Sequence, residues 1–435
     1  MKKAALHNLG CKVNAYETEA MQQMLEEAGY TIVPFTEPAD VYVVNTCSVT
    51  NMADRKSRQM LHRAKAMNPD AIVVGAGCYI QTKMQEAMED PAIDIIIGNN
   101  KKHELIDRIN AFLADRGDAA DIIDINDRGQ GYENLTLSKT AEHVRAFIKV
   151  QDGCNQFCSY CIIPYARGRV RSRDLESVRE EVLRLADSGY REVVLTGIHL
   201  SSWGVDIEDN LLHLITEIHG IEGIERIRLG SLEPRLVTED FARDLAKLSK
   251  VCPHFHLSLQ SGCDATLLRM NRKYTTEEYK RSCDLLRTYF HNPAITTDVI
   301  VGFPQESQEE FDTTVDFLSD IHFYEMHIFQ YSKRQGTRAS VMDGQIPDQV
   351  KKKRSSQLIR LAADMSIEYR RSYLGQELEV LFEEPTRLCG KNYYVGYTKE
   401  YVRVAVETEE NLTNRILRGR GTRMLTDELV LMELL

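Results

Sequence analysis

The feature that most constrains this chain is a group of three closely spaced cysteines, Cys154, Cys158 and Cys161, in the segment CNQFCSYC. The segment directly follows an apolar stretch at residues 144–150, which is typical of a buried strand. Thiolates are natural ligands of iron–sulfur clusters, and three thiolates on a four-iron cube leave one iron open for chemistry. Zinc is the main alternative, but structural zinc sites take four protein ligands and no fourth cysteine is nearby in the sequence. We call these residues the loop cysteines and expect them to hold a 4Fe–4S cluster.

Length and charge narrow the class of protein. The chain has 435 residues, enough for about three domains. Its formal net charge of −11 argues against binding nucleic acid over the whole surface, so any RNA contact has to use local basic patches. The N-terminus lacks the apolar region of a signal peptide, and no run approaches the ~20 apolar residues of a membrane span. We therefore expect a cytoplasmic protein with no membrane partner, whose cysteines stay reduced.

The first third of the chain alternates between strand patterns and helical patterns. Such alternation predicts an α/β fold in which helices cover a parallel sheet. The predicted strands span residues 4–9, 41–45, 71–75 and 93–97, and the predicted helices span residues 15–28, 52–67, 81–88 and 101–114. We assign residues 1–115 to an N-terminal domain and residues 116–139 to a polar linker with room for one short hairpin.

The middle of the chain and the tail follow two further patterns. Strand–helix units between residues 140 and 372 predict a partial (β/α)6 barrel, closed by a long helix at residues 348–374. The predicted barrel strands span residues 144–150, 192–196, 226–229, 255–259, 296–301 and 325–329. In residues 373–435 apolar and polar residues alternate with a period of two, which predicts a small antiparallel β-barrel. Active sites of (β/α) barrels lie where the strands end, so the polar motifs after these strands should line one cavity.

Three more cysteines, far apart in the sequence, each follow a predicted strand of the first domain. They are Cys11, Cys47 and Cys78, and we call them the strand-end cysteines. The strands of a parallel sheet end at one edge, which is where α/β folds bind ligands. Convergence at that edge predicts a second three-thiol site for a 4Fe–4S cluster. A single cysteine of this kind is more often buried and inert, but three at equivalent strand ends favour the cluster.

Both cysteine groups fit one known family. The loop cysteines, with the aromatic Tyr160 before the last of them, match the C-x3-C-x-aromatic-C signature of radical S-adenosylmethionine (radical SAM) enzymes. With the strand-end cysteines included, the whole chain resembles the radical SAM methylthiotransferase family. The resemblance covers LGCKVNAYETE, NTCSVTNMADRKSRQ and GCYIQ in the first domain, the barrel, and a tail similar to the RNA-binding TRAM domain. LGCKVN and the later stretch ARGRVRSR are most similar to the MtaB-type branch.

This resemblance implies a tRNA-modifying enzyme that adds a methylthio group to carbon-2 of threonylcarbamoyladenosine next to the anticodon. It implies SAM and two 4Fe–4S clusters as cofactors. The implied partners of this monomeric enzyme are tRNA, a sulfur source and an electron donor such as flavodoxin or ferredoxin. Related branches act on isopentenyladenosine in tRNA or on a ribosomal protein. A non-catalytic iron–sulfur redox sensor that binds RNA is the alternative from another class.

The resemblance also assigns residues. The loop cysteines bind the cluster that cleaves SAM to a radical, the strand-end cysteines bind the auxiliary cluster involved in sulfur transfer, and Tyr160 lies near the SAM adenine. The SAM pocket is expected from residues at the ends of the barrel strands: Thr196, Gly197, Ser231, Glu233, Gln260 and Ile300. The alternative for each polar residue is a local hydrogen-bonding or capping role.

Two arginine patches stand out against the acidic background. One, the loop arginines, comprises Arg167, Arg169, Arg171 and Arg173, and the other, the tail arginines, comprises Arg415, Arg418, Arg420 and Arg423. We expect both patches to contact tRNA, because arginine suits bidentate recognition of phosphate and carboxylate; the alternative is a solvated surface. Arg169 or Arg171 is expected to pair with the threonyl carboxylate; the alternative is that these arginines touch only tRNA phosphates or acidic neighbours. Gly419 and Gly421 indicate a flexible basic turn or an ordinary hairpin turn.

Overall fold

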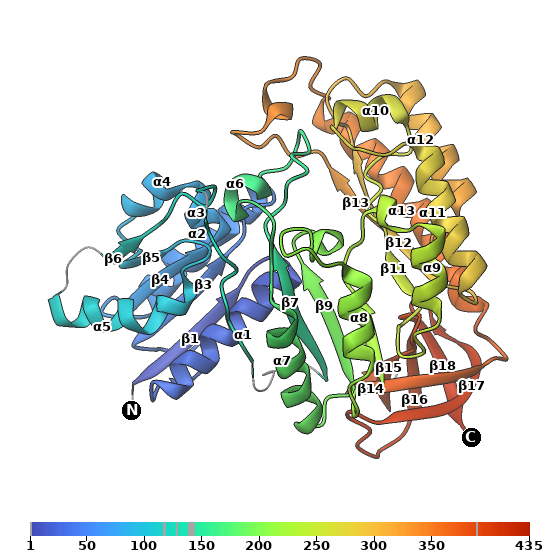
Figure 1. Ribbon diagram of the computed structural model, residues 1–435, viewed down its shortest axis with the longest axis horizontal. Coiled ribbons are helices and arrows are strands. Elements are labelled where there is room, and N and C mark those ends of the chain that lie inside the picture. Colours follow the sequence, from blue (N-terminus) through green and yellow to red (C-terminus); the bar gives the residue numbers. More distant parts are fainter. Residues whose placement is uncertain (1, 116–118, 128, 138–143, 389) are drawn as a thin grey trace.

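The computed structural model describes residues 2–115, 119–127, 129–137, 144–388 and 390–435. Three regions follow one another along the chain: a sheet with helices on both faces, a larger strand–helix region, and a strand-rich tail packed beneath it (Figure 1). This arrangement confirms the predicted α/β fold class. Part of the predicted linker, residues 116–118, 128 and 138–139, lies outside the described residues.

The N-terminal region is a six-stranded parallel sheet in the order β2-β1-β3-β4-β5-β6. Its strands are β1 (Lys3–Asn8), β2 (Thr31–Ile32), β3 (Val41–Thr46), β4 (Ile72–Gly77), β5 (Ile95–Ile97) and β6 (Ala119–Asp121). Its helices are α1 (Lys12–Glu27), α2 (Asn51–Met67), α3 (Cys78–Thr82), α4 (Met84–Met88) and α5 (Leu105–Asp115). Alternate residues of β3 enter the two apolar cores on opposite faces, since Val43 packs with Met21 of α1 and Val44 with Leu61 of α2. The cysteines that follow β1, β3 and β4 therefore come from three adjacent strands.

The middle region forms an open barrel from two short sheets. One has the order β10-β9-β7-β8 and the other β11-β12-β13, and a bridge between Leu232 and Leu257 links them. The strands are β7 (Arg145–Asp152), β8 (Arg171–Ser172), β9 (Glu192–Gly197), β10 (Arg226–Leu229), β11 (His254–His256), β12 (Ala294–Val301) and β13 (Glu325–Gln330). The helices are α6 (Ile163–Arg167), α7 (Leu175–Asp187), α8 (Leu211–His219), α9 (Glu239–Ala246), α10 (Asp264–Arg269), α11 (Thr276–Tyr289), α12 (Gln308–Ile321) and α13 (Asp348–Arg371). One continuous apolar core joins the outer face of these strands to the helices.

The tail forms a closed barrel in the order β14-β15-β16-β18-β17. Its strands are β14 (Glu377–Leu388), β15 (Lys391–Tyr397), β16 (Arg403–Glu407), β17 (Ile416–Thr426) and β18 (Leu429–Leu434). The prediction of a wholly antiparallel barrel is wrong at one pair, because β16 and β18 run parallel. The prediction of a turn at Gly419 and Gly421 is also wrong, because both residues lie inside β17.

The tail barrel is attached to the central barrel through buried arginines. Arg226 Nη1 donates to the carbonyl of Tyr397 at 2.8 Å, and Arg228 Nη1 donates to the carbonyl of Lys399 at 2.9 Å. Both arginines lie on β10 and are at most 1% exposed. The tail therefore closes one end of the central barrel instead of hanging from it on a linker.

The stretch predicted as a linker is partly ordered against its neighbours. β6 adds a parallel strand to the first sheet, so this part does not form the expected hairpin. Leu135 and Leu137 are buried against Tyr16 and Ala20 of α1. Within the described residues, no helix has the length and apolar character needed to cross a membrane.

Candidate active site

The loop cysteines lie directly after β7, where the chain turns back on itself. The amide of Cys154 donates to the carbonyl of Gly168 at 3.0 Å, and the amide of Cys161 donates to the carbonyl of Cys158 at 3.0 Å. Burial raises the pKa of Cys154 to about 11 and that of Cys161 to about 12, and the nearby Cys158 adds to both shifts. The three thiols are therefore close enough to act on one another electrostatically.

The strand-end cysteines also lie close together. A Cβ placed on Gly10 would lie 2.9 Å from Cys47 Sγ, so only a glycine lets this turn approach the thiol. Burial, with a smaller contribution from the neighbouring Cys78 and Cys11, raises the pKa of Cys47 to about 11. The structure therefore brings residues that are more than thirty positions apart into one group of thiols.

Each cysteine group receives a hydrogen bond from an arginine that sequence reasoning missed in this role. Arg272 Nη1 donates to Cys158 Sγ at 3.2 Å, and Arg167 Nε donates to Cys78 Sγ at 3.3 Å. Asn99 Nδ2 also lies 3.5 Å from Cys78 Sγ. Each arginine thus places a positive charge beside the sulfur of a predicted metal ligand. No local sequence signal marks these donors, because 89 residues separate Arg167 from Cys78 and 114 residues separate Arg272 from Cys158.

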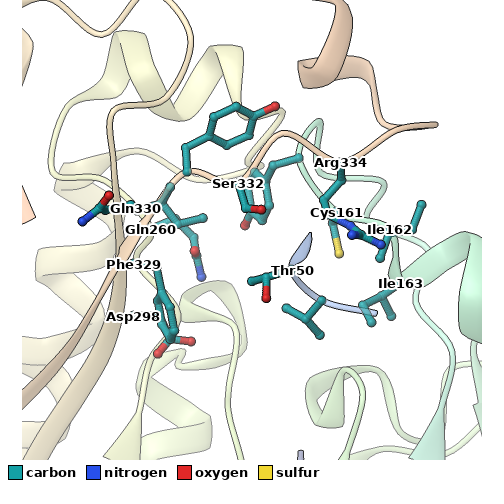
Figure 2. Close-up of a pocket in the computed structure, with 14 residues that line it drawn as sticks. Thr50, Cys161, Ile162, Ile163, Gln260, Asp298, Phe329, Gln330, Ser332 and Arg334 are labelled. Atoms are coloured by element: carbon teal, nitrogen blue, oxygen red, sulfur yellow. The ribbon is translucent and has the colours of Figure 1, made fainter. Parts of the chain in front are cut away.

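A cavity of about 240 Å³ lies between the two regions. Its lining comes from the turn after β3, the loop-cysteine segment, and the ends of the barrel strands (Figure 2). The residues that line it are Val49, Thr50, Tyr160, Cys161, Ile162, Ile163, Gln260, Asp298, Ile300, Phe329, Gln330, Tyr331, Ser332 and Arg334. Cys161 of the loop cysteines therefore lines the cavity directly, and the segment that follows the strand-end residue Cys47 contributes Val49 and Thr50.

The residues predicted for SAM fall into three sets. Tyr160, Gln260 and Ile300 line the cavity beside Cys161. Glu233 accepts a hydrogen bond from Gln156 Nε2 in the loop at 3.1 Å. The remaining three follow or end strands without lining the cavity: Thr196 is buried, Gly197 packs against Gln151, and Ser231 is exposed.

The loop arginines do not form the exposed patch that the sequence predicts. Arg167, Arg171 and Arg173 are at most 3% exposed. Arg171 donates to the carbonyl of Arg167 at 3.0 Å, and Arg173 pairs with Glu181 at 2.6 Å. Only Arg169 is exposed, with its guanidinium 4.6 Å from the centre of the Phe157 ring. Contact with RNA through the three buried arginines is therefore wrong for this structure, whereas Arg169 remains accessible.

Arg167 belongs to a buried group of charges centred on Glu17 of α1. Glu17 is fully buried and lies 2.5 Å from Arg167, 2.7 Å from Lys149 and 3.1 Å from Lys102. Burial would raise the pKa of Glu17, but Arg167, Lys102 and Lys149 lower it well below its ordinary value. Because Lys102 belongs to the N-terminal region and Lys149 to β7 of the central barrel, this carboxylate joins the two regions.

The tail arginines, by contrast, are all exposed. Three of them lie on β17, and Arg418 pairs with Glu379 at only 3.4 Å with 75% of its side chain accessible. Surface pairs of this kind contribute little to stability, so these arginines are free to exchange partners.

Two family models match the chain. The model described as the radical SAM superfamily matches residues 148–318, and the model described as uncharacterized protein family UPF0004 matches residues 3–98. The first match contains the loop cysteines and the second contains the strand-end cysteines.

Curated relatives extend over nearly the whole chain. A Bacillus subtilis protein named threonylcarbamoyladenosine tRNA methylthiotransferase MtaB is 41% identical, with 99% of this chain and 98% of that protein covered. An Aquifex aeolicus protein of the same name is 42% identical, with 90% and 95% covered. A Moorella thermoacetica protein named tRNA-2-methylthio-N(6)-dimethylallyladenosine synthase is 35% identical, with 96% and 95% covered. The chain therefore belongs to the radical SAM methylthiotransferase family.

The Bacillus subtilis and Aquifex aeolicus relatives, both above 40% identity, are MtaB proteins, which confirms the predicted resemblance to the MtaB-type branch. The protein is thus an enzyme, with SAM and 4Fe–4S clusters as the predicted cofactors of its family. This assignment sets aside the alternative of a non-catalytic redox sensor. Among solved structures, the radical SAM methyltransferase TsrM from Kitasatospora setae has a TM-score of 0.60 at 18% identity, with 78% of this chain and 77% of that chain covered. That likeness supports the fold alone.

Proposed function

We propose that this enzyme adds a methylthio group to carbon-2 of threonylcarbamoyladenosine next to the tRNA anticodon. The loop cysteines would hold the cluster that cleaves SAM, and the strand-end cysteines would hold the auxiliary cluster. One observation carries this proposal: Thr50, three residues after Cys47, and Cys161 line the same cavity. Each group has three thiols and a cationic donor to sulfur, which fits a 4Fe–4S cluster that keeps one iron for a non-protein ligand.

When bound, SAM and the clusters supply radical formation and the transferred sulfur. The residues of the chain position these groups and exclude water. Tyr160, Gln260 and Ile300 form a wall beside Cys161 that would hold SAM. Ile162 and Ile163 add apolar surface on the same side of the cavity and would keep water from the reacting atoms. Arg272 and Arg167 would stabilise the negative charge of the two thiolate groups.

The choice of substrate is supported by the names of the relatives above 40% identity. Isopentenyladenosine in tRNA is the second candidate, because a relative named for that product is 35% identical over 96% of the chain. No feature of the cavity favours a ribosomal protein.

For tRNA itself, we propose that the exposed Arg169, Arg418 and Arg420 contact phosphates. The electron donor, flavodoxin or ferredoxin, and the sulfur source complete the set of proposed partners. The enzyme is proposed to act in the cytoplasm as a monomer.

Nucleoside analysis of tRNA tests the proposed substrate. A strain that lacks this gene should accumulate threonylcarbamoyladenosine without its 2-methylthio derivative, and the intact gene should restore the derivative. Restoration of 2-methylthio-isopentenyladenosine instead would show that the enzyme belongs to the branch that acts on isopentenyladenosine.

Iron analysis tests the two cysteine groups. Anaerobic reconstitution should give about eight irons per chain if each group holds a four-iron cluster. Alanine at all three loop cysteines should halve the iron and abolish formation of 5′-deoxyadenosine from SAM. Alanine at all three strand-end cysteines should halve the iron but leave SAM cleavage in place. Full iron content in the second variant would refute the auxiliary site.

A further inference from the structure

The inner face of β11–β13 carries a cluster of three polar side chains that no role above uses: His256, Asp298 and His327. His256 Nε2 lies 3.4 Å from Asp298 Oδ2, and the rings of His256 and His327 stack with centroids 5.9 Å apart. One donor atom from each of the three side chains falls within 4.8 Å of the others. We call this group the lumen triad.

The register of the sheet explains why the lumen triad forms. Asp298 pairs with His327 across β12 and β13, and His256 pairs with Thr296 across β11 and β12. Residues two apart on a strand share a face, so Asp298 faces the same side as Ile300, which lines the cavity. His256 Nδ1 lies 3.0 Å from Thr296 Oγ1, which fixes the orientation of the ring and leaves Nε2 directed toward Asp298.

One member of the lumen triad, Asp298, faces the cavity directly. Asp298 itself lines the cavity, where Figure 2 shows its carboxylate beside Phe329 and across from Cys161 and Ile163. The side chains of His256 and Asp298 are 14% and 31% accessible, and His327 is exposed. Asp298 lies two residues before Ile300 on β12, which places it about 6.6 Å deeper in the barrel than the residues beside the loop cysteines.

This depth suits the part of the substrate that differs between family branches. In adenine, carbon-2 and carbon-6 flank the same ring nitrogen, so a group on N6 extends from the ring on the side next to the reacting carbon. Phe329, 48% exposed in the cavity wall, offers a face on which an extruded base can stack. A base held there with carbon-2 toward the loop cysteines would direct its N6 group along the wall toward the lumen triad.

The chemistry of the two N6 groups differs sharply. A threonylcarbamoyl group has N–H and hydroxyl donors, carbonyl acceptors and a carboxylate, whereas an isopentenyl group is a hydrocarbon. An Asp carboxylate accepts hydrogen bonds and an imidazole N–H donates them, so together they match the polar group. A hydrocarbon in the same place would strip water from these three side chains without replacing the missing hydrogen bonds, which is unfavourable.

We propose that His256, Asp298 and His327 bind the polar N6 substituent of the target adenosine and so determine the choice between threonylcarbamoyl and isopentenyl substrates. This inference rests on the proposed function. The sequence predicts Arg169 or Arg171 for the same role, but Arg171 is buried and Arg169 is not among the residues that line the cavity. Asp298 does line the cavity, and one donor atom from each of His256 and His327 lies within 4.8 Å of it, so the lumen triad can contact a group on a base inside the cavity.

The test uses the full-length protein with both clusters reconstituted and three anticodon stem-loop RNAs of one sequence. The target position carries threonylcarbamoyladenosine, isopentenyladenosine or plain adenosine. The variants are His256→Gln, His327→Gln and Asp298→Asn, which keep polar side chains of similar size. His213→Gln is the matched control, because His213 also pairs with an aspartate, Asp209 at 2.9 Å, but lies on the exposed face of α8. Kd for each RNA, methylthiolated product, iron and zinc content, and 5′-deoxyadenosine formed without RNA are measured.

The wild type should bind the threonylcarbamoyl RNA more tightly than the plain RNA. Each triad variant should lose about ten- to a hundredfold of that preference, with unchanged affinity for plain RNA and unchanged RNA-independent SAM cleavage. The His213→Gln control should retain the preference. If the triad variants keep the wild-type preference, or weaken all three RNAs equally, the inference is overturned.

Two further results distinguish this inference from a metal site and from failure of the proposed function. One zinc per chain that is present in the wild type and absent from the triad variants would overturn substrate binding in favour of a metal site. A wild type that neither prefers nor methylthiolates the threonylcarbamoyl RNA would overturn the proposed function together with the inference. A wild-type preference that persists in the variants overturns the inference alone.

Discussion

Replacement of Glu17 by glutamine should destabilise the protein far more than a single charge removal on the surface. The carboxylate is fully buried, and three cations lie within 3.1 Å of it. Glutamine keeps the shape and one acceptor oxygen but leaves Arg167, Lys102 and Lys149 without this counter-charge. Removing one partner of a buried ion pair typically costs about 3–5 kcal/mol of unfolding free energy, because an uncompensated charge stays buried. At roughly 2–4 °C per kcal/mol, the thermal midpoint of the affected region should fall by about 6–20 °C.

Differential scanning calorimetry of wild type, Glu17→Gln and Glu27→Gln measures this effect. Glu27 lies at the exposed end of the same helix, where its partner is Gln23 at 2.8 Å, so the Glu27→Gln midpoint should stay close to wild type. The double variant Glu17→Gln, Arg167→Gln should be less destabilised than the sum of the single variants, because the second change removes one stranded cation. Equal midpoints for Glu17→Gln and Glu27→Gln would refute the charge argument.

The pH dependence gives an independent check with a defined sign. The folded pKa of Glu17 is well below its ordinary value of 4.5, so the unfolded state binds more protons as the pH falls through this range. The stabilisation is fully present above about pH 4.5 and disappears as the pH drops toward the lower folded pKa. The stability gap between wild type and Glu17→Gln should therefore be constant near neutral pH and shrink below that value. A gap that widens in acid would contradict the assignment.

Three other outcomes are expected. Changing the tail arginines to alanine should make tRNA binding less dependent on salt. In filter binding across salt concentrations, the slope of log affinity against log salt concentration should become shallower by roughly 0.7 for each phosphate that is no longer neutralised. An unchanged slope would place the RNA-binding surface elsewhere. Deleting the tail from Gly375 onward should lower the thermal midpoint of the barrel, because it removes the carbonyl partners of the buried Arg226 and Arg228; an unchanged midpoint would show that the two barrels are independent. Arg272→Gln should shift the reduction potential of the cluster at the loop cysteines to more negative values, because a cationic donor to Cys158 Sγ favours the reduced state. An EPR-monitored titration measures the potential, and the iron content should stay at the wild-type level.

Much of the candidate site could be predicted because strand ends are visible in the sequence. Cys11, Cys47 and Cys78 each follow an apolar run, and parallel strands deliver their C-terminal ends to one edge. The structure adds that β1, β3 and β4 are neighbours in the sheet, which the sequence order alone does not determine.

The loop arginines show where the same reasoning fails. Arg167 and Arg173 lie in a basic stretch that is typical of a phosphate-binding surface, yet their partners Glu17 and Glu181 come from helices α1 and α7. A run of like charges in the sequence says nothing about acids that packing will bring to it. Burial of three of the four arginines therefore follows from tertiary structure alone.

Gly419 and Gly421 show a second kind of failure. Glycines between arginines indicate a turn, but here they lie in β17 because other backbone approaches closely. A Cβ on Gly419 would lie 2.3 Å from the carbonyl oxygen of Glu433, and one on Gly421 would lie 2.5 Å from that of Tyr373. The lack of a side chain serves packing at both positions, and Arg420 between them remains exposed on the strand.

The lumen triad was beyond sequence reasoning for a related reason. His256, Asp298 and His327 lack metal-ligand or catalytic spacing, and each alone is a common polar residue of a half-buried strand. Their meeting depends on the parallel register of β11, β12 and β13. Asp298 on β12 is opposite His327 on β13, and His256 on β11 is opposite Thr296, which lies two residues before Asp298 on β12. The same register places Ile300 and Phe329 above them, next to the loop cysteines. A barrel wall that is apolar near the reacting atom and polar farther down suits a flat base with a polar extension. It would serve a hydrocarbon extension poorly, so specificity for the N6 group can reside in the wall while the cysteines serve both branches of the family.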